Sequence, residues 1–505
     1  MKKTGLKTLL ALLLLLSLLL SACKADATPG PTSAPPGSTT TPAPTGRPTP
    51  SSTPPPVPTT GPTAASAWVE PVPPYAGVEI NSLTDIDLVQ GLGATWVRRN
   101  ALQWALVEPA PGERNWDAVA GLEAELQEIA SLGMQVTLIV RDTPAWAQKV
   151  PGSFCGPASP ESLDAFAAFL HDAVLRYSAP PFSVRYWELG NEPDVDFALV
   201  APTSQFGCWG DDGDLEYYGG AYYGEMLKVV YPQIKLADPA AQVVVGGLLM
   251  DCDPLNPPET PPGSGVFANC TPSRFLEGIL ESGAGDFFDG VAFHAYDYYY
   301  DTLGKYGNAN WHSGWSSTGP VVAAKVDYVR SLLAAYGHSD KFLMNTETAL
   351  LCGRNGAEPQ CQAEEFALTK AYYLVQAFTV GQSLGLEANI WYSVSGWRGS
   401  GLVDASAGGG DAALLPAYNA LQVYLSLLDK AAFWREITDT PGVRVYEFRQ
   451  GTQVLWVVWS QDGGEHLLPL PSAPQAVLDV MGQNLETASE VMVTVAPIYL
   501  IWGAP

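Results

Sequence analysis

The chain has 505 residues, of which 47% are hydrophobic and 15% are charged. This length is too great for one small domain. It suits an α/β barrel, which can run past about 250 residues as one unit, together with further segments. Acidic residues outnumber basic ones by 52 to 26, and the net charge of −26 argues against nucleic acid as a partner, because phosphates require clustered cations. With 10% aromatic residues, the composition suits a secreted protein that handles neutral ligands such as sugars.

The first 23 residues have the pattern of an export signal. Lys2 and Lys3 precede an apolar run, Leu9 to Leu20, that is too short to span a bilayer comfortably. The run ends at Cys23 after small residues, which resembles the lipobox of bacterial lipoproteins and predicts lipid attachment at Cys23. Several acyl chains on one residue would form a stable membrane anchor. An ordinary signal peptide with a chance cysteine is the alternative.

Residues 24–67 consist almost only of Pro, Thr, Ser, Ala and Gly, with 13 prolines between Pro29 and Pro62. Such a segment has little apolar surface to bury, so we expect it to be disordered. Proline favours an extended chain of about 3.1 Å per residue, so some 40 residues would reach roughly 100 Å. We interpret the segment as a stalk between the membrane and a globular part.

Residues 68–428 alternate short β-rich runs with amphipathic helical stretches such as Ala118 to Leu132 and Ser162 to Tyr177. Eight strands with intervening helices predict a closed (β/α)₈ barrel, the TIM barrel. A doubly wound open sheet is the alternative, but the residues after Val78 lack its Gly-rich phosphate loop. The expected strands are Gly77–Ile80, Thr95–Arg98, Gln135–Val140, Val184–Leu189, Gln242–Gly246, Gly290–His294, Lys341–Asn345 and Ala388–Tyr392.

Residues 429–505 show strand-like runs without a long helix between them. This pattern predicts a small all-β sandwich. We expect a structural role for it, with carbohydrate binding as the alternative. The expected strands are Val443–Phe448, Val454–Trp459, Ala476–Val480 and Val491–Trp502.

Six cysteines follow the lipobox, and an even number in an oxidising compartment predicts disulfides. Two pairs would close short loops, and the third pair is left by elimination, although six cysteines allow 15 connectivities. No cysteine pair has zinc-site spacing and no two histidines lie at helical i, i+4 spacing, so no transition-metal centre is expected. The expected pairs are Cys252–Cys270, Cys352–Cys361 and Cys155–Cys208.

Two glutamates occupy the carboxyl ends of predicted strands, where barrel enzymes place their chemistry. Glu192 ends the fourth strand, because Pro193 cannot continue the sheet hydrogen bonds. Glu347 ends the seventh strand, so the two carboxylates would face each other across the barrel mouth. Glu188 shares the strand parity of Glu192 but lies deeper, and we expect it to be an interior charge.

The run Trp187 to Pro193 resembles the Asn-Glu-Pro signature of clan A glycoside hydrolases, and Thr346-Glu347 resembles their seventh-strand nucleophile motif. The resemblance covers about residues 75 to 430 and is nearest to glycoside hydrolase families 39 and 5. It implies a retaining mechanism, with Glu192 as general acid and then general base. Glu347 would be the nucleophile that forms a glycosyl-enzyme intermediate.

The same resemblance implies several helper residues. Asn191 would hydrogen-bond the sugar 2-hydroxyl, Tyr296 would donate to Glu347, and Arg98 would keep Glu347 ionised. Arg99 points the other way on an ideal strand, so the choice of Arg98 depends on strand parity. A structural ion pair is the alternative for Arg98.

Two tryptophans and one histidine complete the expected site. Trp391 would form the apolar floor under the sugar ring, and Trp146 would line the cleft, because sugar C–H faces stack on aromatic rings. Packing in the core is the alternative for Trp391. His294 is as compatible with an interior position as with the site.

The sequence therefore predicts a retaining glycoside hydrolase with a carbohydrate substrate and no cofactor. Its N-terminal lipid would hold it on the outer side of the bacterial cell membrane. The alternative is a non-catalytic carbohydrate-binding surface lipoprotein, although binding alone needs no carboxylate at either strand end. The loops between the strands do not identify the sugar.

Overall fold

The computed structural model describes residues 68–503, except 196–199, 202–203, 205, 258–264, 301–310 and 405–412. The expected signal peptide, Cys23 and the Pro-rich segment lie outside the described residues. Within the described part, no helix combines the length and the apolar character needed to cross a membrane.

Eight parallel strands close into a barrel, as the sequence predicted. The hydrogen-bonded order is β1-β2-β3-β4-β5-β6-β8-β9, and β9 pairs with β1 to complete the circle. A short antiparallel strand, β7 (Trp311–Ser313), extends the outer end of β6. The barrel strands are β1 Ala76–Glu79, β2 Trp96–Gln103, β3 Gln135–Arg141, β4 Tyr186–Asn191, β5 Gln242–Leu248, β6 Gly290–Tyr299, β8 Phe342–Cys352 and β9 Ala388–Trp391.

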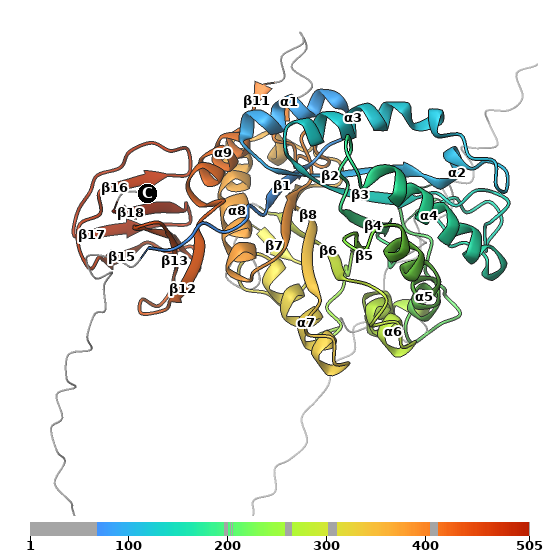
Figure 1. The fold of residues 1–505 in the computed structure, drawn as a ribbon. Coiled ribbons are helices and arrows are strands. Elements are labelled where there is room, and N and C mark those ends of the chain that lie inside the picture. The colour runs from blue at the N-terminus through green and yellow to red at the C-terminus, as the bar shows by residue number, and fades with distance from the viewer. Residues whose placement is uncertain are drawn as a thin grey trace, which may run out of the picture. The chain divides into compact units, whose positions relative to one another are not determined.

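A helix follows each barrel strand, and Figure 1 shows these helices around the outside of the sheet. Their apolar stripes pack against the outward side chains of the strands. A glycine such as Gly93, with φ of 81°, ends a helix at no steric cost. The helices are α1 Leu83–Leu92, the four-residue α2 Trp104–Val107, α3 Ala120–Ser131, α4 Leu163–Tyr177, α5 Gly220–Ala237, α6 Phe275–Glu281, α7 Val322–Ala335, α8 Glu364–Ser383 and α9 Pro416–Leu428.

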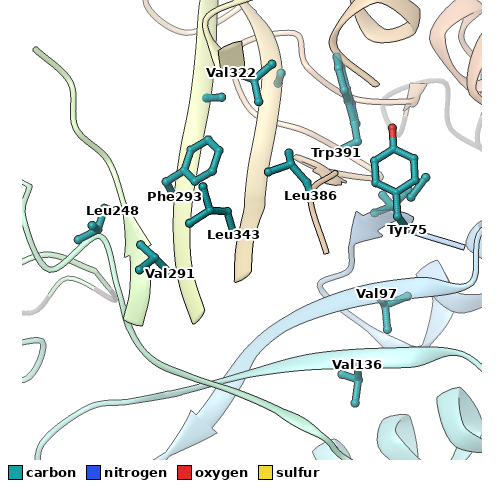
Figure 2. Close-up of a cluster of buried hydrophobic side chains, with 14 of the residues drawn as sticks. Tyr75, Val97, Val136, Leu248, Val291, Phe293, Val322, Leu343, Leu386 and Trp391 are labelled. Carbon is teal, nitrogen blue, oxygen red and sulfur yellow. The ribbon is translucent and has the colours of Figure 1, made fainter. Parts of the chain in front are cut away.

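The barrel interior is layered because side chains alternate along each strand. Trp96, Tyr186, Met344 and Ile390 belong to one buried apolar cluster. Two residues further along the strands, this layer gives way to a polar one that includes Arg98. The opposite strand faces contribute to the larger core under the helices, part of which Figure 2 shows.

An irregularity in β8 changes which side chains face the interior. The register with β6 pairs Phe293 with Asn345, but the next residue, His294, pairs with Glu347. One extra residue in β8 therefore opposes β6, as in a β-bulge. Strict alternation from Met344 would turn Thr346 inward; the extra residue brings Glu347 there instead.

The C-terminal part contains a five-stranded and a two-stranded antiparallel sheet. One face of the larger sheet contributes Phe448 and Tyr499 to the main core, and the other contributes to a separate apolar cluster that includes Leu468 of the smaller sheet. The single strand expected over Val491–Trp502 is wrong: it divides into two strands of different sheets. The strands are β12 Ala432–Ile437, β13 Val443–Gln450, β14 Gln453–Ser460, β15 His466–Pro469, β16 Ala476–Asp479, β17 Glu490–Val493 and β18 Ile498–Trp502.

All three expected disulfides form. Cys155 pairs with Cys208, Cys252 with Cys270, and Cys352 with Cys361, at Cα–Cα distances of 5.4, 5.5 and 5.6 Å. The last of these closes the chain directly after β8. It therefore constrains a loop at the carboxyl-terminal face of the barrel.

Candidate active site

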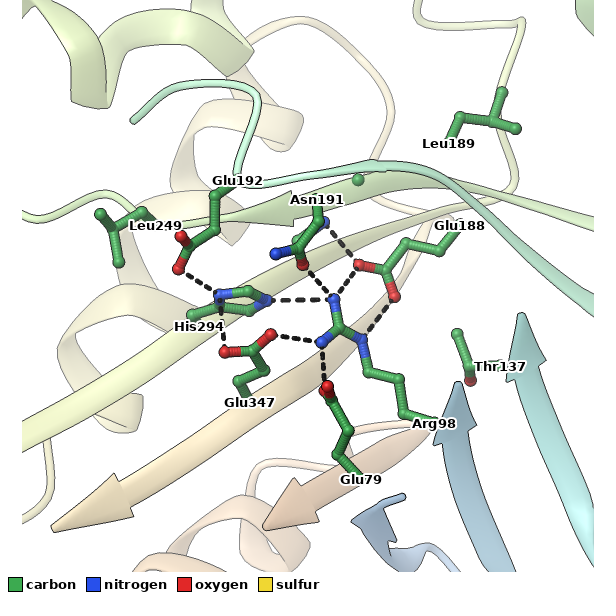
Figure 3. A network of polar contacts seen from close by, with 12 residues as sticks. Glu79, Arg98, Thr137, Glu188, Leu189, Asn191, Glu192, Leu249, His294 and Glu347 are labelled. Carbon is green, nitrogen blue, oxygen red and sulfur yellow. Dashed lines mark hydrogen bonds and ion pairs between the residues drawn. The ribbon is translucent and has the colours of Figure 1, made fainter. Parts of the chain in front are cut away.

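The end of β4 carries Asn191 and Glu192. Asn191 is the last residue of the strand, and Glu192 has a φ of 48°, a left-handed conformation that turns the chain away from the sheet. The Glu192 backbone still donates to the carbonyl of Gly247, which fixes this turn against β5. The Glu192 side chain is buried and reaches toward β6 (Figure 3).

Glu347 approaches from the other side of the barrel. The extra residue in β8 directs its carboxylate into the interior, where it is also buried. A carboxylate oxygen of Glu347 and one of Glu192 lie within 4.8 Å of each other, with a ring nitrogen of His294 within the same distance of both. Two glutamates that are 155 positions apart in the sequence therefore meet at one point.

Arg98 holds the centre of the polar layer and is fully buried (Figure 3). Its Nη1 donates to Glu79 at 2.5 Å and to Glu347, and its Nε and Nη2 donate to Glu188 at 3.0 and 2.7 Å. Nη2 also donates to Asn191. Arg98 lies within β2, rather than at its end as expected, and it contacts Glu347 as expected.

Arg99 has the opposite orientation. Its Nε donates to Glu125 of α3 at 2.6 Å, outside the barrel. Strand alternation therefore gives Arg98 the interior position. Glu188 is an interior charge, as expected, because it is fully buried and also accepts from the amide of Gly247 at 2.8 Å.

His294 of β6 lies between the two glutamates. Burial, together with the nearby charges of Arg98 and Lys325, lowers the pKa of His294 well below its usual value, so the ring is neutral. Arg98 Nη2 lies 3.4 Å from Nε2, which must therefore accept, and this assigns the proton to Nδ1. Nδ1–H then donates to Glu192 at 2.8 Å and lies 3.5 Å from Glu347.

The two glutamates have different electrostatic surroundings. Burial raises the pKa of Glu192 well above its usual value, and the charges of Glu347 and Asp194 raise it further. Burial also raises the pKa of Glu347, but Arg98 and a hydrogen bond from Tyr296 oppose that rise. This arrangement favours a protonated Glu192 beside an ionised Glu347.

Glu79 of β1 adds another carboxyl group to the cluster. Burial raises the pKa of Glu79 to about 8, although Arg98 opposes this and the charge of Glu347 adds to it. Since His294 is neutral, Arg98 is the only cation in direct contact with these carboxyl groups among the described residues. Glu79 therefore holds a proton near neutral pH.

A second buried layer supports Glu192. Asp194 accepts from the amides of Leu249 and Met250, both at 2.8 Å. Lys325 of α7 donates to the carbonyls of Leu249 and His294, both at 2.7 Å. These bonds join the segments after β4 and β5 to β6, and so they fix the backbone around the site.

Tyr296 is placed as expected, but Trp391 is not. The hydroxyl of Tyr296 donates to Glu347. Trp391 is fully buried in the helix-facing core, where its Nε1 donates to the carbonyl of Ser400 at 2.9 Å. The expectation that Trp391 forms a floor under a sugar is therefore wrong.

Tyr392 has the orientation that was expected of Trp391. Strand alternation from the interior Ile390 turns residue 392 inward and residue 391 outward. The Tyr392 ring lies 6.0 Å from that of Tyr296, edge to face. Burial raises the pKa of Tyr392, and the charges of Glu347, Glu79 and Glu192 raise it further.

Of the other two expected residues, Asn191 lies in the site, whereas Trp146 contacts residues outside it. Asn191 accepts from Arg98 through its side-chain oxygen, which leaves its amide group directed to the side where Glu192 lies (Figure 3). Trp146 donates to the carbonyl of Glu108 at 3.1 Å and packs edge-on to Trp104. Its place in a cleft stays a prediction.

The sequence interpretation missed Glu79, Tyr392, Asp194 and Lys325. Glu79 carried a usable signal, because a charged residue within an apolar strand requires an interior partner. Tyr392 could have been found by extending the alternation of β9. Lys325 lies in an ordinary helical pattern, and no local signal distinguishes it.

The cluster of Glu192, His294 and Glu347 consists of residue types that can bind a metal ion. Arg98 already contacts Glu347, and its positive charge opposes that of a second cation there. We therefore assign no metal to this cluster.

Comparisons with known proteins give a consistent structural class. No family model matches the chain, and no curated protein matches it in sequence. A family 39 glycoside hydrolase from Bacteroides cellulosilyticus WH2 has a TM-score of 0.60 and 19% identity, over 85% of this chain and 81% of that chain. A GH30 endoxylanase from Clostridium papyrosolvens C71 has a TM-score of 0.54 and 12% identity, over 86% and 98%.

A third similar structure is the thermostable GH51 α-L-arabinofuranosidase from Thermotoga petrophila RKU-1. Its TM-score is 0.52 with 12% identity, over 86% of this chain and 98% of that chain. At such low identity, these likenesses establish a shared fold. The chain therefore has the barrel architecture, with added C-terminal sheets, of several glycoside hydrolases.

Proposed function

We propose that this protein is a retaining glycoside hydrolase that cleaves O-glycosidic bonds of poly- or oligosaccharides. The observation that carries the proposal is the approach of Glu192 and Glu347 within 4.8 Å. Retaining enzymes hold their two carboxyl groups about 5–5.5 Å apart, whereas inverting enzymes need about 6.5–9.5 Å to admit a water molecule. The short separation supports double displacement.

In the first step, Glu192 is the general acid and Glu347 is the nucleophile. Glu192 gives its proton to the glycosidic oxygen, and the leaving group departs as an alcohol. A carboxylate oxygen of Glu347 forms a bond with the anomeric carbon. Arg98 and Tyr296 suit this role of Glu347, because both favour its ionised form.

In the second step, water attacks the anomeric carbon and Glu192 accepts its proton. The charge of Glu347 is one cause of the high pKa of Glu192, and that charge disappears in the covalent intermediate. The pKa of Glu192 then falls, which suits a general base. The bond to Glu347 breaks, and two inversions give net retention.

Asn191, His294 and the two tyrosines complete the proposed site. The amide of Asn191 would donate to a hydroxyl group of the sugar next to the cleaved bond. His294 is a positioning residue that orients both glutamates through Nδ1–H. Tyr296 and Tyr392 offer aromatic surface for the sugar ring.

We further propose that the enzyme is held on the outer side of the bacterial membrane by lipid on Cys23. Three disulfides favour an oxidising compartment. Cells expressing the protein would be grown with an alkyne-tagged fatty acid. Label on the wild type and its loss in Cys23→Ala would support the anchor, whereas an unlabelled wild type would contradict it.

The enzymatic proposal is tested with a panel of aryl glycosides of both anomeric forms. Wild-type turnover should fall by at least about 10³-fold in both Glu192→Ala and Glu347→Ala. Azide should restore turnover to Glu192→Ala and give a glycosyl azide with the anomeric configuration of the substrate, because that variant can still form the intermediate but lacks the base for water. Binding of polysaccharide without any hydrolysis by the wild type would instead favour the non-catalytic carbohydrate-binding lipoprotein.

A further inference from the structure

Arg398 lies in the loop between β9 and α9, on the same face of the barrel as the two glutamates. Its backbone carbonyl accepts from the amide of Cys352, the last residue of β8, at 2.8 Å. Its Nη2 donates to the carbonyl of Gly353. The residue is thus attached to the outer end of the strand that carries Glu347.

The guanidinium group of Arg398 lies near two aromatic rings. Its central carbon is 5.3 Å from the ring centroid of Tyr298 and 5.2 Å from that of Trp397. The Trp397 side is open, because that residue is 52% exposed. Cation–π contacts of this kind hold a guanidinium group in place while its edge stays available for hydrogen bonds.

Arg398 differs from the other arginines in its ion pairs. Arg185, Arg330 and Arg354 are exposed. Of the remaining arginines in the described part of the chain, Arg398 alone has no carboxylate of a described residue within ion-pair distance. Its Nε is buried and has no hydrogen-bond partner there.

The loop around Arg398 is held rigidly. Lys370 of α8 donates to the carbonyls of Gly399 and Gly401 at 2.8 and 2.5 Å. The hydroxyl of Ser400 accepts from the Trp397 amide at 2.9 Å, and its carbonyl accepts from Trp391. A preformed loop reduces the entropy lost when a ligand binds.

Tyr298 connects this loop to the glutamates. It lies two residues beyond Tyr296 on β6, so both side chains share one face, about 7 Å apart along the strand. Tyr296 donates to Glu347. The charge of Glu192 is also among the causes, after burial, that raise the pKa of Tyr298. Arg398 is therefore linked through Tyr298 to the strand whose Tyr296 contacts Glu347.

We propose that Arg398, in cation–π contact with Tyr298 and Trp397, binds the carboxylate of a uronic acid residue next to the sugar at which cleavage occurs. This inference rests on the proposed function and narrows its substrate class to acidic glycans. A planar carboxylate matches the planar fork of a guanidinium group, and water is partly excluded around Arg398. A neutral sugar would offer the cation no counter-charge.

The test uses full-length Glu347→Gln protein, so that ligands are bound without turnover. Glucuronate- and galacturonate-containing oligosaccharides are titrated calorimetrically, beside the same oligosaccharides after chemical reduction of their carboxyl groups. A charge-assisted contact predicts that at least one acidic ligand binds about 10- to 100-fold more tightly than its reduced form. Adding Arg398→Gln should remove most of this preference, and Arg398→Lys should keep part of it. Arg354→Gln, at an exposed arginine of a neighbouring loop, is the matched control and should leave the preference unchanged.

The outcomes separate this inference from the enzymatic proposal. Equal or weaker binding of every acidic ligand overturns the uronate site, as does an Arg398→Gln variant that keeps the full preference. In either case, hydrolysis of neutral glycosides by the wild type would leave the enzymatic proposal standing. Conversely, an Arg398-dependent preference without hydrolysis of any glycoside would leave the uronate site but refute the hydrolase.

Discussion

Replacing Arg98 with methionine should destabilise the fold strongly, because it leaves several buried carboxyl groups without a cation. Arg98 is fully buried and donates to Glu79, Glu188 and Glu347. Removing one partner of a buried ion pair costs about 3–5 kcal/mol. Because Glu79 can take up a proton, we expect the free energy of unfolding at pH 7 to fall by the amount for one ion pair. It should not fall by the sum for three pairs.

The loss should also depend on pH. Without Arg98, which opposes the rise, the folded-state pKa values of Glu79 and Glu347 move further above their unfolded values. A carboxyl group with a raised pKa contributes stability that is present at low pH and is lost as the pH rises through the folded-state pKa. The difference between Arg98→Met and wild type should therefore be larger at pH 8 than at pH 5.

Urea denaturation at these two pH values measures the free energy of unfolding, with Arg99→Met as the matched control. Arg99 is the next residue of β2, but it pairs with Glu125 outside the barrel, where both side chains keep some exposure, so its loss should cost less than that of the fully buried Arg98. Two results would refute this account of the polar layer. One is an equal decrease in the free energy of unfolding for the two variants, and the other is a decrease for Arg98→Met that is no larger at pH 8 than at pH 5.

Three further predictions concern single side chains of the site. Glu79→Gln should reduce the fall in stability between pH 5 and 8, because the pKa of Glu79 is raised to about 8; an unchanged pH–stability curve would count against this. Asp194→Asn should move the alkaline limb of the kcat/KM profile to lower pH, because it removes a charge that raises the pKa of Glu192. Tyr296→Phe should lower kcat about 10- to 100-fold by removing a hydrogen bond to Glu347, and a kcat within twofold of wild type would contradict that role.

The barrel and the two glutamates could be predicted because their signals are local. Apolar runs at regular spacing identify the strands, and Pro193 marks the end of β4 just after Glu192. Even so, the inward direction of Glu347 depends on the extra residue in β8. That irregularity is a pairing between strands, and a single sequence does not contain it.

The errors also have physical causes. Trp391 was chosen for its chemistry, but alternation along β9 makes Tyr392 the inward residue. The run Val491–Trp502 has continuous β-propensity, yet its two halves pair with different partners, β15 and β14. Glu79 and Lys325 acquire their surroundings only from residues far away in the chain.

The most direct test of the central claim is the stereochemistry of the first product. Hydrolysis of the best aryl glycoside would be followed by proton NMR, before the released sugar equilibrates between its two anomers. Glu192 and Glu347 lie within 4.8 Å of each other, which predicts a first-formed product with the same anomeric configuration as the substrate. A first-formed product of the opposite configuration would contradict the proposed roles of both residues.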